Sequence, residues 1–304
     1  MNRRELLGLL SALTPLAAMA SEARPEIAVT FDDPKTAQLA GLPWQQINER
    51  ILATLARHRL QAMLFVCGMR VDSEAGRALV AAWDQAGHLI GNHSYSHWNI
   101  DDHPLEAFEA DLIRNEPLIR SYRHFTRSFR FPFFKEGQTV QKRDGMRAFL
   151  AAHGYRIGRA TVDASDWAIS ARLEKRVQAD PGADLAGYRD FFLEHIWQRA
   201  QFYQGLAQQV LGKPVRHTVL LHHSPLNALF LDDLLAMLAA RGWRLVDASH
   251  AYRDPLYERQ PQCLPAGESL IWALAKQTGR FEGQLRYPGE DDVYENPRMD
   301  ALKL

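Results

Sequence analysis

The chain has 304 residues, and its 36 basic and 36 acidic side chains give a formal net charge of zero. A chain without a surplus of Lys and Arg lacks the electrostatic footprint of proteins that bind nucleic acid or anionic membranes. Apolar residues make up 46% of the sequence, which excludes the disordered and fibrous classes. We therefore expect a globular protein with a sizeable core and no nucleic-acid partner, and the sequence carries no signal for its oligomeric state.

The first twenty residues have the pattern of an export signal. Arg3 and Arg4 precede an apolar stretch over 6–20, which ends in the small-x-small triplet Ala18-Met19-Ala20 that signal peptidase cuts. The stretch is shorter than the roughly 18 or more apolar residues of a membrane-spanning helix, and we expect no such span elsewhere. We expect 1–20 to be removed and the protein to be periplasmic or extracellular. The paired arginines also resemble a twin-arginine signal; an apolar first helix is the alternative.

Short apolar runs alternate with helical patterns after this signal. The expected strands are 27–31, 62–67, 88–92, 128–131, 155–162, 217–221 and 243–246. Apolar residues recur at helical spacing over 44–57, 105–119, 185–211 and 231–240. This alternation is typical of βα units around a parallel sheet, and seven strands favour a barrel over a small open sheet. We therefore expect an α/β barrel over 21–252.

The pattern changes after about Tyr252. The segment 253–304 contains five prolines and one short predicted helix, at about 269–276. We expect this segment to be a C-terminal extension, mostly an extended tail, that packs on the barrel.

The chain has two cysteines, Cys67 and Cys263. Two thiols are too few for a disulfide framework, even in an oxidising compartment. Because Cys67 lies in an apolar run, we expect a buried free thiol, and a bridge to Cys263 remains the alternative.

Candidate catalytic residues follow two of the expected strands. Asp32 and Asp33 end the first strand, and His93 and His97 come after the third. Sites in parallel α/β proteins are built at the carboxyl ends of strands. Adjacent carboxylates point in different directions, so one can bind a metal while the other acts as a base. Two histidines four residues apart share one side of a helical turn, and an Asp-His-His set leaves positions open for water and substrate.

Five motifs in order carry a resemblance to a known family. They are Thr-Phe-Asp-Asp (30–33), His-Ser-x-x-His (93–97), Arg-Phe-Pro-Phe (130–133), Asp-Ala-Ser-Asp-Trp (163–167) and Leu-Leu-His (220–222). Over about residues 26 to 250 the chain resembles the polysaccharide deacetylases, carbohydrate esterase family 4. The resemblance implies a distorted, TIM-like (β/α)7 barrel and the metal-dependent removal of acetyl groups from N-acetylated sugars of the chitin or peptidoglycan type.

The resemblance also implies roles for individual residues. Asp33, His93 and His97 match the family's ligands to one divalent metal ion, which we expect to be zinc, with cobalt or nickel as alternatives. Asp32 matches the general base that takes a proton from the attacking water. His222 resembles the general acid that protonates the leaving amine.

Further residues match the remaining motifs. Arg130 resembles the arginine that shapes the electrostatics of the site, and Asp166 the carboxylate that orients neighbouring charges, with Asp163 as its rival. Phe133 stands where the family usually has Tyr, and its backbone N–H would donate to the oxyanion. Trp167 resembles the aromatic wall for the acetyl methyl group.

Three points at the candidate site remain open from the sequence. Trp98, directly after the metal histidines, is a candidate sugar platform, and Pro34 replaces the glycine that usually follows the Asp pair. Strand alternation allows only one of His222 and His223 to face the barrel mouth. Alternation favours His223, but we choose His222 because in the family the acid directly follows the Leu-Leu pair.

Other functions fit the same residues. The substrate could be an O-acetyl ester or an amide that is not a sugar, because this machinery suits any acyl carbonyl. The chain could also be an inactive carbohydrate-binding relative that keeps the groove and uses no metal.

Overall fold

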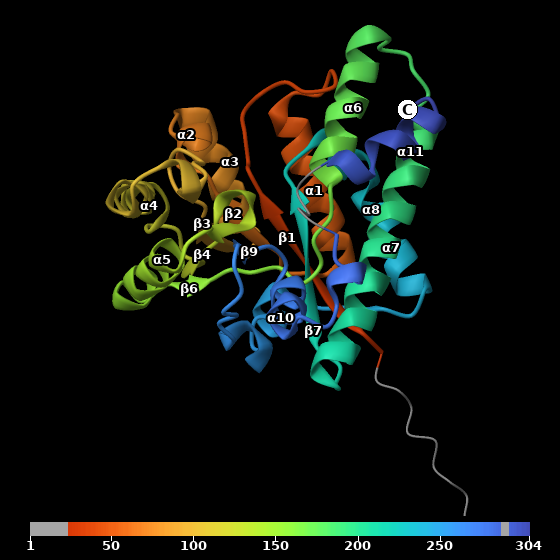
Figure 1. The fold of residues 1–304 in the computed structure, drawn as a ribbon. Helices are drawn as coiled ribbons and strands as arrows, with labels where there is room; N and C mark the ends of the chain where they lie inside the picture. The colour runs from red at the N-terminus through yellow and green to blue at the C-terminus, as the bar shows by residue number, and fades with distance from the viewer. Residues whose placement is uncertain (1–23, 287–291) are drawn as a thin grey trace, which may run out of the picture.

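A parallel sheet forms the centre of the protein, whose computed structural model describes residues 24–286 and 292–304 (Figure 1). The predicted export signal lies outside the described residues and stays a prediction. The sheet contains seven strands in the order β6-β4-β3-β2-β1-β7, with β8 also paired to β1. The strands are β1 (Glu26–Asp32), β2 (Met63–Val66), β3 (Leu89–Asn92), β4 (Phe125–Phe129), β6 (Arg156–Ile157), β7 (Arg216–His222) and β8 (Arg244–Leu245).

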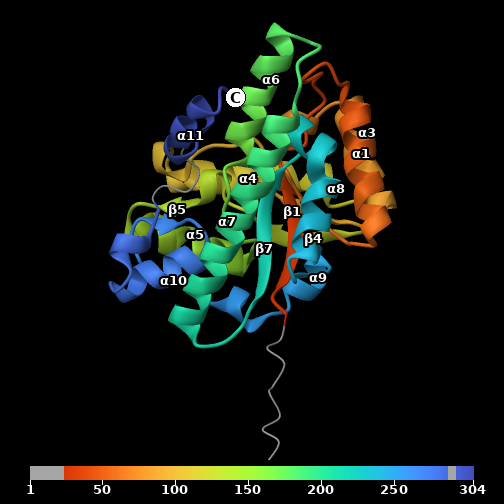
Figure 2. The same cartoon turned by 90° about the vertical axis from the view of Figure 1, so that its right-hand side faces the viewer.

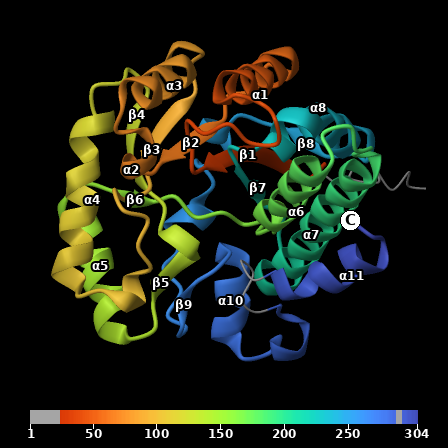
Figure 3. The same ribbon diagram turned by 90° about the horizontal axis from the view of Figure 1, so that it is seen from above.

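Helices surround the curled sheet, as the view from above shows (Figure 3). They are α1 (Trp44–His58), α2 (Gly68–Val71), α3 (Glu74–Gln85), α4 (Leu105–Ile119), α5 (Val140–Ala152), α6 (Asp166–Ala179), α7 (Ala186–Leu211), α8 (Pro225–Ala240) and α9 (Ala248–Ala251). In α1, Ile47, Ile51 and Leu55 recur every four residues and are buried in the main core. Among the described helices none is long and apolar enough to cross a membrane.

One crossing segment closes the barrel. β1 pairs with β7 along its whole length (Figure 2), and at the far edge β6 pairs with β4. Five residues after Ile157 the same segment reaches β7, where Val162 pairs with Val219. The prediction of one continuous strand over 155–162 was therefore wrong, because the chain leaves β4 and crosses to β7. The distorted (β/α)7 barrel is confirmed.

The C-terminal extension covers this crossing segment. Its strand β9 (Ala266–Gly267) pairs antiparallel with β5 (Lys135–Gly137), and α10 (Leu270–Thr278) packs on α7. The backbone N–H of Leu270 donates to the carbonyl oxygen of Ala160 (2.8 Å), and the Ser269 hydroxyl donates to that of Thr161 (2.8 Å). The extension thus satisfies carbonyl groups that the incomplete barrel leaves open.

The expectation of a single regular element in the extension was wrong. The helix expected at about 269–276 is present as α10, but β9, the 3₁₀ helices η3 (Pro255–Glu258), η4 (Glu282–Gln284) and η5 (Asp292–Tyr294), and α11 (Asn296–Ala301) are regular as well. The remaining 3₁₀ helices, η1 (Ile100–Asp102) and η2 (Pro132–Phe134), lie in the barrel loops. Both cysteine thiols are free, and Cys67 is buried as expected.

A buried ion network joins the extension to the barrel. The Glu136 carboxylate in β5 accepts hydrogen bonds from Arg159 (2.7 and 2.8 Å) and from Nη2 of Arg147 (2.7 Å). Burial would raise the pKa of this carboxyl, but the two guanidinium groups outweigh burial and hold the pKa below its ordinary value. The same arginines donate to the carbonyl oxygens of Arg259 (3.1 Å) and Pro261 (2.8 Å) in the extension.

Removing the Glu136 carboxylate should destabilise the whole fold. In Glu136→Ala the Arg159 guanidinium stays buried without its counter-charge, which typically costs about 3–5 kcal/mol. The free energy of unfolding, measured by urea denaturation at neutral pH, should fall by that order. Glu258→Ala is the matched control, because Glu258 pairs with Arg156 at 3.2 Å in an exposed ion pair, worth at most about 1 kcal/mol. Equal losses in the two variants would contradict the role of the network.

Candidate active site

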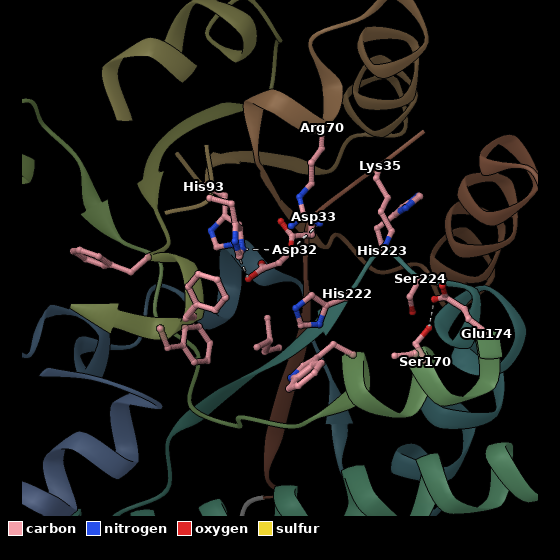
Figure 4. Close-up of a pocket in the computed structure, with 17 residues that line it drawn as sticks. Asp32, Asp33, Lys35, Arg70, His93, Ser170, Glu174, His222, His223 and Ser224 are labelled. Carbon is pink, nitrogen blue, oxygen red and sulfur yellow. Dashed lines mark hydrogen bonds and ion pairs between the residues drawn. The ribbon is translucent and has the colours of Figure 1, made fainter. Parts of the chain in front are cut away.

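A cavity of about 460 Å³ opens at the carboxyl ends of β1 and β7 and the loop after β3 (Figure 4). Five predicted catalytic or metal-binding residues line it: Asp32, Asp33, His93, His97 and His222. Two predicted substrate-binding residues, Phe133 and Trp167, line it as well. The other lining residues are Lys35, Arg70, Phe131, Phe134, Ser170, Ala171, Glu174, Leu220, His223 and Ser224. The topology thus brings together residues that lie up to 190 positions apart in the chain.

Asp33, His93 and His97 form a set that fits a metal ion. One ligand atom from each lies within 4.8 Å of the others. His93 Nδ1 lies 2.8 Å from the carbonyl oxygen of Arg130, which leaves Nε2 for a ligand. Asp33 Oδ1 is buried and has no hydrogen-bond partner among the described residues, and a buried oxygen of this kind requires a partner. One oxygen and two imidazole nitrogens suit zinc and similar ions and leave open positions.

The charges around the triad favour the forms that bind a cation. Burial would raise the pKa of Asp33, but His97, His93 and Arg70 outweigh it and hold the pKa below its ordinary value. Burial also lowers the pKa of His97 and keeps that of His93 well below its ordinary value. An ionised carboxylate and neutral imidazoles are the protonation states that ligands require.

The two histidines converge through a loop. The helical turn expected for 93–97 is wrong, because these residues lie outside the helices and Ser94 (φ 61°) and His97 (φ 54°) are left-handed. The backbone N–H groups of Tyr95 and Ser96 donate to Oδ2 of Asp111 on α4 (3.1 and 2.9 Å). Asp111 therefore shapes the loop that brings the imidazole rings to 5.0 Å between centroids.

Arg130 holds the predicted base. Its guanidinium is 1% exposed, and Nη1 donates to Asp32 Oδ1 (2.7 Å) and to the Thr30 hydroxyl (3.0 Å). Nε donates to the carbonyl oxygen of Gly158 (2.7 Å) and Nη2 to the Tyr252 hydroxyl (3.1 Å). Burial raises the pKa of Asp32 to about 6, although Arg130 opposes this shift. Tyr252 was not predicted as a site residue, because it lies 122 residues from Arg130 and belongs to none of the five motifs.

His222 and Asp166 form a hydrogen-bonded pair. His222 Nδ1 lies 2.7 Å from Asp166 Oδ1, and the His222 backbone N–H donates to Oδ2 (2.8 Å). Asn227, also missed from the sequence, donates to the same Oδ2 (2.8 Å). Burial would lower the pKa of His222, but Asp166, Asp32 and Asp33 outweigh it and raise the pKa to about 9. A cationic imidazole in the cavity is therefore available as a proton donor at neutral pH.

The rival residues occupy different places. His223 also lines the cavity, but it is 1% exposed, and its Nε2 lies 3.3 Å from Asn48 Oδ1 in α1. Burial lowers the pKa of His223 to about 4, so its imidazole is neutral at neutral pH. Asp163 is buried, and its carbonyl oxygen accepts a hydrogen bond from Arg199 Nε (3.4 Å). The carboxylate that pairs with His222 is that of Asp166.

Aromatic side chains form the apolar wall of the cavity. Phe133 is left-handed (φ 57°) and 44% exposed, and its ring lies edge-on to His97 with 4.7 Å between centroids. Trp167 also lines the cavity. Trp98 is not among the described residues that do so, because its ring stacks on His103 at 4.0 Å. The substrate contact predicted for Trp98 stays a prediction.

The fold and cavity together define an α/β barrel with an Asp-His-His triad that could hold a metal ion, beside Asp32 and the His222–Asp166 pair. The family model for polysaccharide deacetylase matches residues 20–158. The chain is 24% identical over 229 residues to the peptidoglycan-N-acetylglucosamine deacetylase of Bacillus cereus, covering 73% of this chain and 66% of that protein. It is 25% identical over 142 residues to that of Listeria monocytogenes, covering 46% and 26%. The resemblance to the polysaccharide deacetylases is confirmed, although the chain spans less than two thirds of these relatives.

Solved structures share the fold. The chitin deacetylase from the fungal pathogen Colletotrichum lindemuthianum has a TM-score of 0.53 at 17% identity, covering 75% of this chain and 88% of that one. A family 4 pseudoenzyme from Bacillus anthracis has a TM-score of 0.52 at 18% identity, covering 75% and 65%. Because the fold carries both a deacetylase and a pseudoenzyme, any activity depends on the residues of the site.

Asp166→Asn should shift the pH range over which the cavity acid works. Without the carboxylate charge, the pKa of His222 falls from about 9, so the protonated form is lost at a lower pH. The alkaline limb of the kcat/KM profile should move down by at least about one pH unit. Asp163→Asn is the matched control and should leave this limb in place. An unmoved limb in Asp166→Asn, or an equal shift in both variants, would contradict the assignment.

Proposed function

We propose that this protein is a metal-dependent hydrolase that removes acetyl groups from N-acetylated sugars. The observation that carries the proposal is the arrangement of the Asp33, His93 and His97 triad, with its unpartnered buried oxygen, beside Asp32 and the His222–Asp166 pair. The names of the relatives support an acetylated glycan as substrate. The complete set of acid, base and ligand residues favours an active enzyme over an inactive relative.

Asp33, His93 and His97 would hold one divalent ion, for which zinc is the first candidate and cobalt or nickel the alternatives. Such an ion, when bound, acidifies a water molecule and polarises an acyl carbonyl. The protein fixes the donor set through the Arg130 carbonyl behind His93 and the loop that Asp111 shapes.

The remaining residues move protons. Asp32 accepts a proton from the water that attacks the acetyl carbonyl, with Oδ1 held by Arg130 and Oδ2 free of that contact. As the carbon–nitrogen bond breaks, His222 donates a proton to the leaving nitrogen, and Asp166 stabilises the cationic imidazole beforehand. The products are acetate and a free amine.

The aromatic wall positions the acetyl group. The backbone N–H of Phe133 would donate to the developing oxyanion, and the apolar side chains of Trp167 and Leu220 would accommodate the methyl group. Acetate release from chitin oligomers, peptidoglycan, acetylated xylan and simple amides would separate the N-acetyl sugar from an O-acetyl ester or another amide.

Activity should require the bound ion. Chelation should abolish acetate release, and zinc or cobalt should restore it. In His97→Ala one of three ligands is lost, so metal affinity and turnover should both fall by at least about tenfold. His103→Ala is the control, since this nearby imidazole stacks on Trp98 and lies outside the triad. Full turnover by His97→Ala protein shown to be metal-free would overturn the metal assignment.

His222 and His223 should differ sharply in kinetics. Loss of a general acid typically costs about 10²- to 10⁴-fold in rate, so His222→Ala should lose at least that much while its metal content stays unchanged. His223→Ala should lose far less, because its ring contacts Asn48 rather than the acid–base pair. If His223→Ala were the slower variant, the acid would be His223.

A further inference from the structure

A buried histidine on α7 contacts the segment that carries Asp166. His195 is 1% exposed and is not among the described residues that line the candidate active site. Its Nε2 accepts a hydrogen bond from the backbone N–H of Ser165 (3.0 Å), the residue directly before Asp166. None of the five motifs contains His195. The structure therefore shows a contact behind the His222–Asp166 pair that the sequence did not indicate.

This hydrogen bond fixes the start of α6. Ser165 is the N-cap residue of α6, and Asp166 is its first residue. The backbone N–H groups at a helix start have no acceptor inside the helix, so a buried one needs an acceptor from elsewhere. The Asp166 carboxylate in turn accepts from the His222 backbone N–H (2.8 Å) and from Asn227 (2.8 Å), and it pairs with His222 Nδ1 (2.7 Å). A shift of the helix start would therefore disturb the contacts of this carboxylate with His222.

The C-terminal extension favours the tautomer of His195 that this hydrogen bond requires. Because Nε2 accepts, the ring proton must be on Nδ1. Nδ1 lies 3.6 Å from Oε1 of Glu295, a fully buried carboxylate that also accepts from Arg286. This distance is longer than a hydrogen bond, but a buried negative charge at such a range still favours the proton on the nitrogen that faces it.

The surroundings of His195 also keep its imidazole neutral. Burial holds the pKa of His195 well below its ordinary value, and Arg199, Arg286 and Arg298 lower it further. A protonated ring would carry a proton on Nε2 as well and could no longer accept from the backbone N–H of Ser165. The charges around the ring therefore agree with the geometry of its hydrogen bond.

Glu295 is fixed by the last helix of the extension. Its backbone carbonyl oxygen accepts from the N–H groups of Arg298 (3.1 Å) and Met299 (3.0 Å) in the first turn of α11. Arg298 Nη1 donates to Gln198 Oε1 on α7 (3.1 Å), and α11 lies beside α7 in Figure 3. The extension thus holds Glu295 against the helix that carries His195.

We propose that His195 and Glu295 are positioning residues for the His222–Asp166 pair. Glu295 keeps the ring proton of His195 on Nδ1, and His195 holds the Ser165 N–H and with it the start of α6. This inference rests on the proposed function only in taking His222 as the acid. It gives the extension a part in the site, although none of its described residues lines the cavity.

The test measures the pKa of the His222 imidazole by NMR titration of the whole metal-free chain, with His222→Ala to identify the resonance. In His195→Leu the Ser165 N–H loses its acceptor, so the pKa of His222 should fall from about 9 by about one pH unit. Asp32 and Asp33, which also raise this pKa, are unchanged in the variant. His195→Gln should keep the wild-type pKa, because its amide oxygen can accept at the position of Nε2.

His217→Leu is the matched control. His217 is also fully buried, and it joins α7 to the crossing segment through Gln204 (2.7 Å) and Thr161 (3.0 Å). Its loss should lower the free energy of unfolding, as the loss of His195 does, but neither of its contacts involves Ser165 or Asp166. The pKa of His222 should therefore stay in place. An equal shift in both leucine variants would reveal a purely structural role and overturn the proposal, as would an unmoved pKa in His195→Leu.

Glu295→Leu tests the part of the extension and keeps the proposal falsifiable if His195→Leu does not fold. The required tautomer of His195 is less favoured in this variant, so the pKa of His222 should fall by about half a pH unit. Glu282→Leu is the control, because Glu282 lies in the same extension and pairs with Lys276 (2.8 Å) at the surface. An unmoved pKa in Glu295→Leu, or an equal shift in Glu282→Leu, would also overturn the proposal.

Acetate release separates this inference from the proposed function. In His195→Leu kcat should fall about tenfold with KM within about twofold of wild type, because the acid is misplaced while the cavity wall is unchanged. A shifted pKa, together with wild-type protein that releases no acetate, supports the positioning role and contradicts the proposed function. Acetate release with an unmoved pKa and an unchanged kcat in His195→Leu leaves the proposed function standing and removes the inference.

Discussion

The buried guanidinium of Arg130 connects the closure of the barrel to the arrangement of the site. A cation that is 1% exposed is tolerated only when its donors are satisfied. Those donors reach Thr30 and Asp32 on β1, the carbonyl of Gly158 in the crossing segment, and Tyr252 directly before the extension. The same hydrogen bonds therefore hold three distant parts of the chain together and fix the orientation of one carboxylate oxygen of Asp32.

Backbone strain is concentrated where the chemistry is expected. Asp33, Ser94, His97 and Phe133 are non-glycine residues with φ between 54° and 61°. Such conformations typically cost about 1–3 kcal/mol each and persist only where the surroundings enforce them. The contacts of Asp111 with the 93–97 loop and the full pairing of β1 with β7 provide this enforcement. The ligand and wall residues are thus held in place before any ligand binds.

Much of the architecture follows from local pattern. Apolar runs and helical spacing predicted the main elements, and the motifs after β1 and β3 predicted where Asp33 and His93 would meet. Residue spacing could not show that His97 is brought in by a strained loop, because that loop depends on Asp111 in a later helix. Nor could it show the contact of Arg130 with Tyr252, since a buried hydrogen bond across 122 residues leaves no periodic signal.

Alternation along β7 favoured His223 as the residue that faces the cavity, whereas it is His222 that pairs with Asp166 there. His222 is the last residue of β7. The Asp166 carboxylate in α6 accepts a hydrogen bond from the His222 backbone N–H and pairs with the ring Nδ1 of the same residue. His223 follows the strand and turns toward Asn48 in α1. Side-chain direction at a strand end is set by these tertiary partners, so the period of two no longer decides it.

The contacts that close the barrel join segments that lie far apart in the chain. The Thr30 hydroxyl of β1 donates to the carbonyl oxygen of Val219, 189 residues later in the chain. Thr161 in the crossing segment accepts from the Ser269 hydroxyl, which follows 108 residues after it. Contacts so distant in sequence form slowly, and an unpaired strand edge is prone to aggregate meanwhile. A nascent chain that stops before the extension would leave the carbonyl groups of Ala160 and Thr161 in the crossing segment without these hydrogen-bond donors, so the barrel is complete only when the extension has been made.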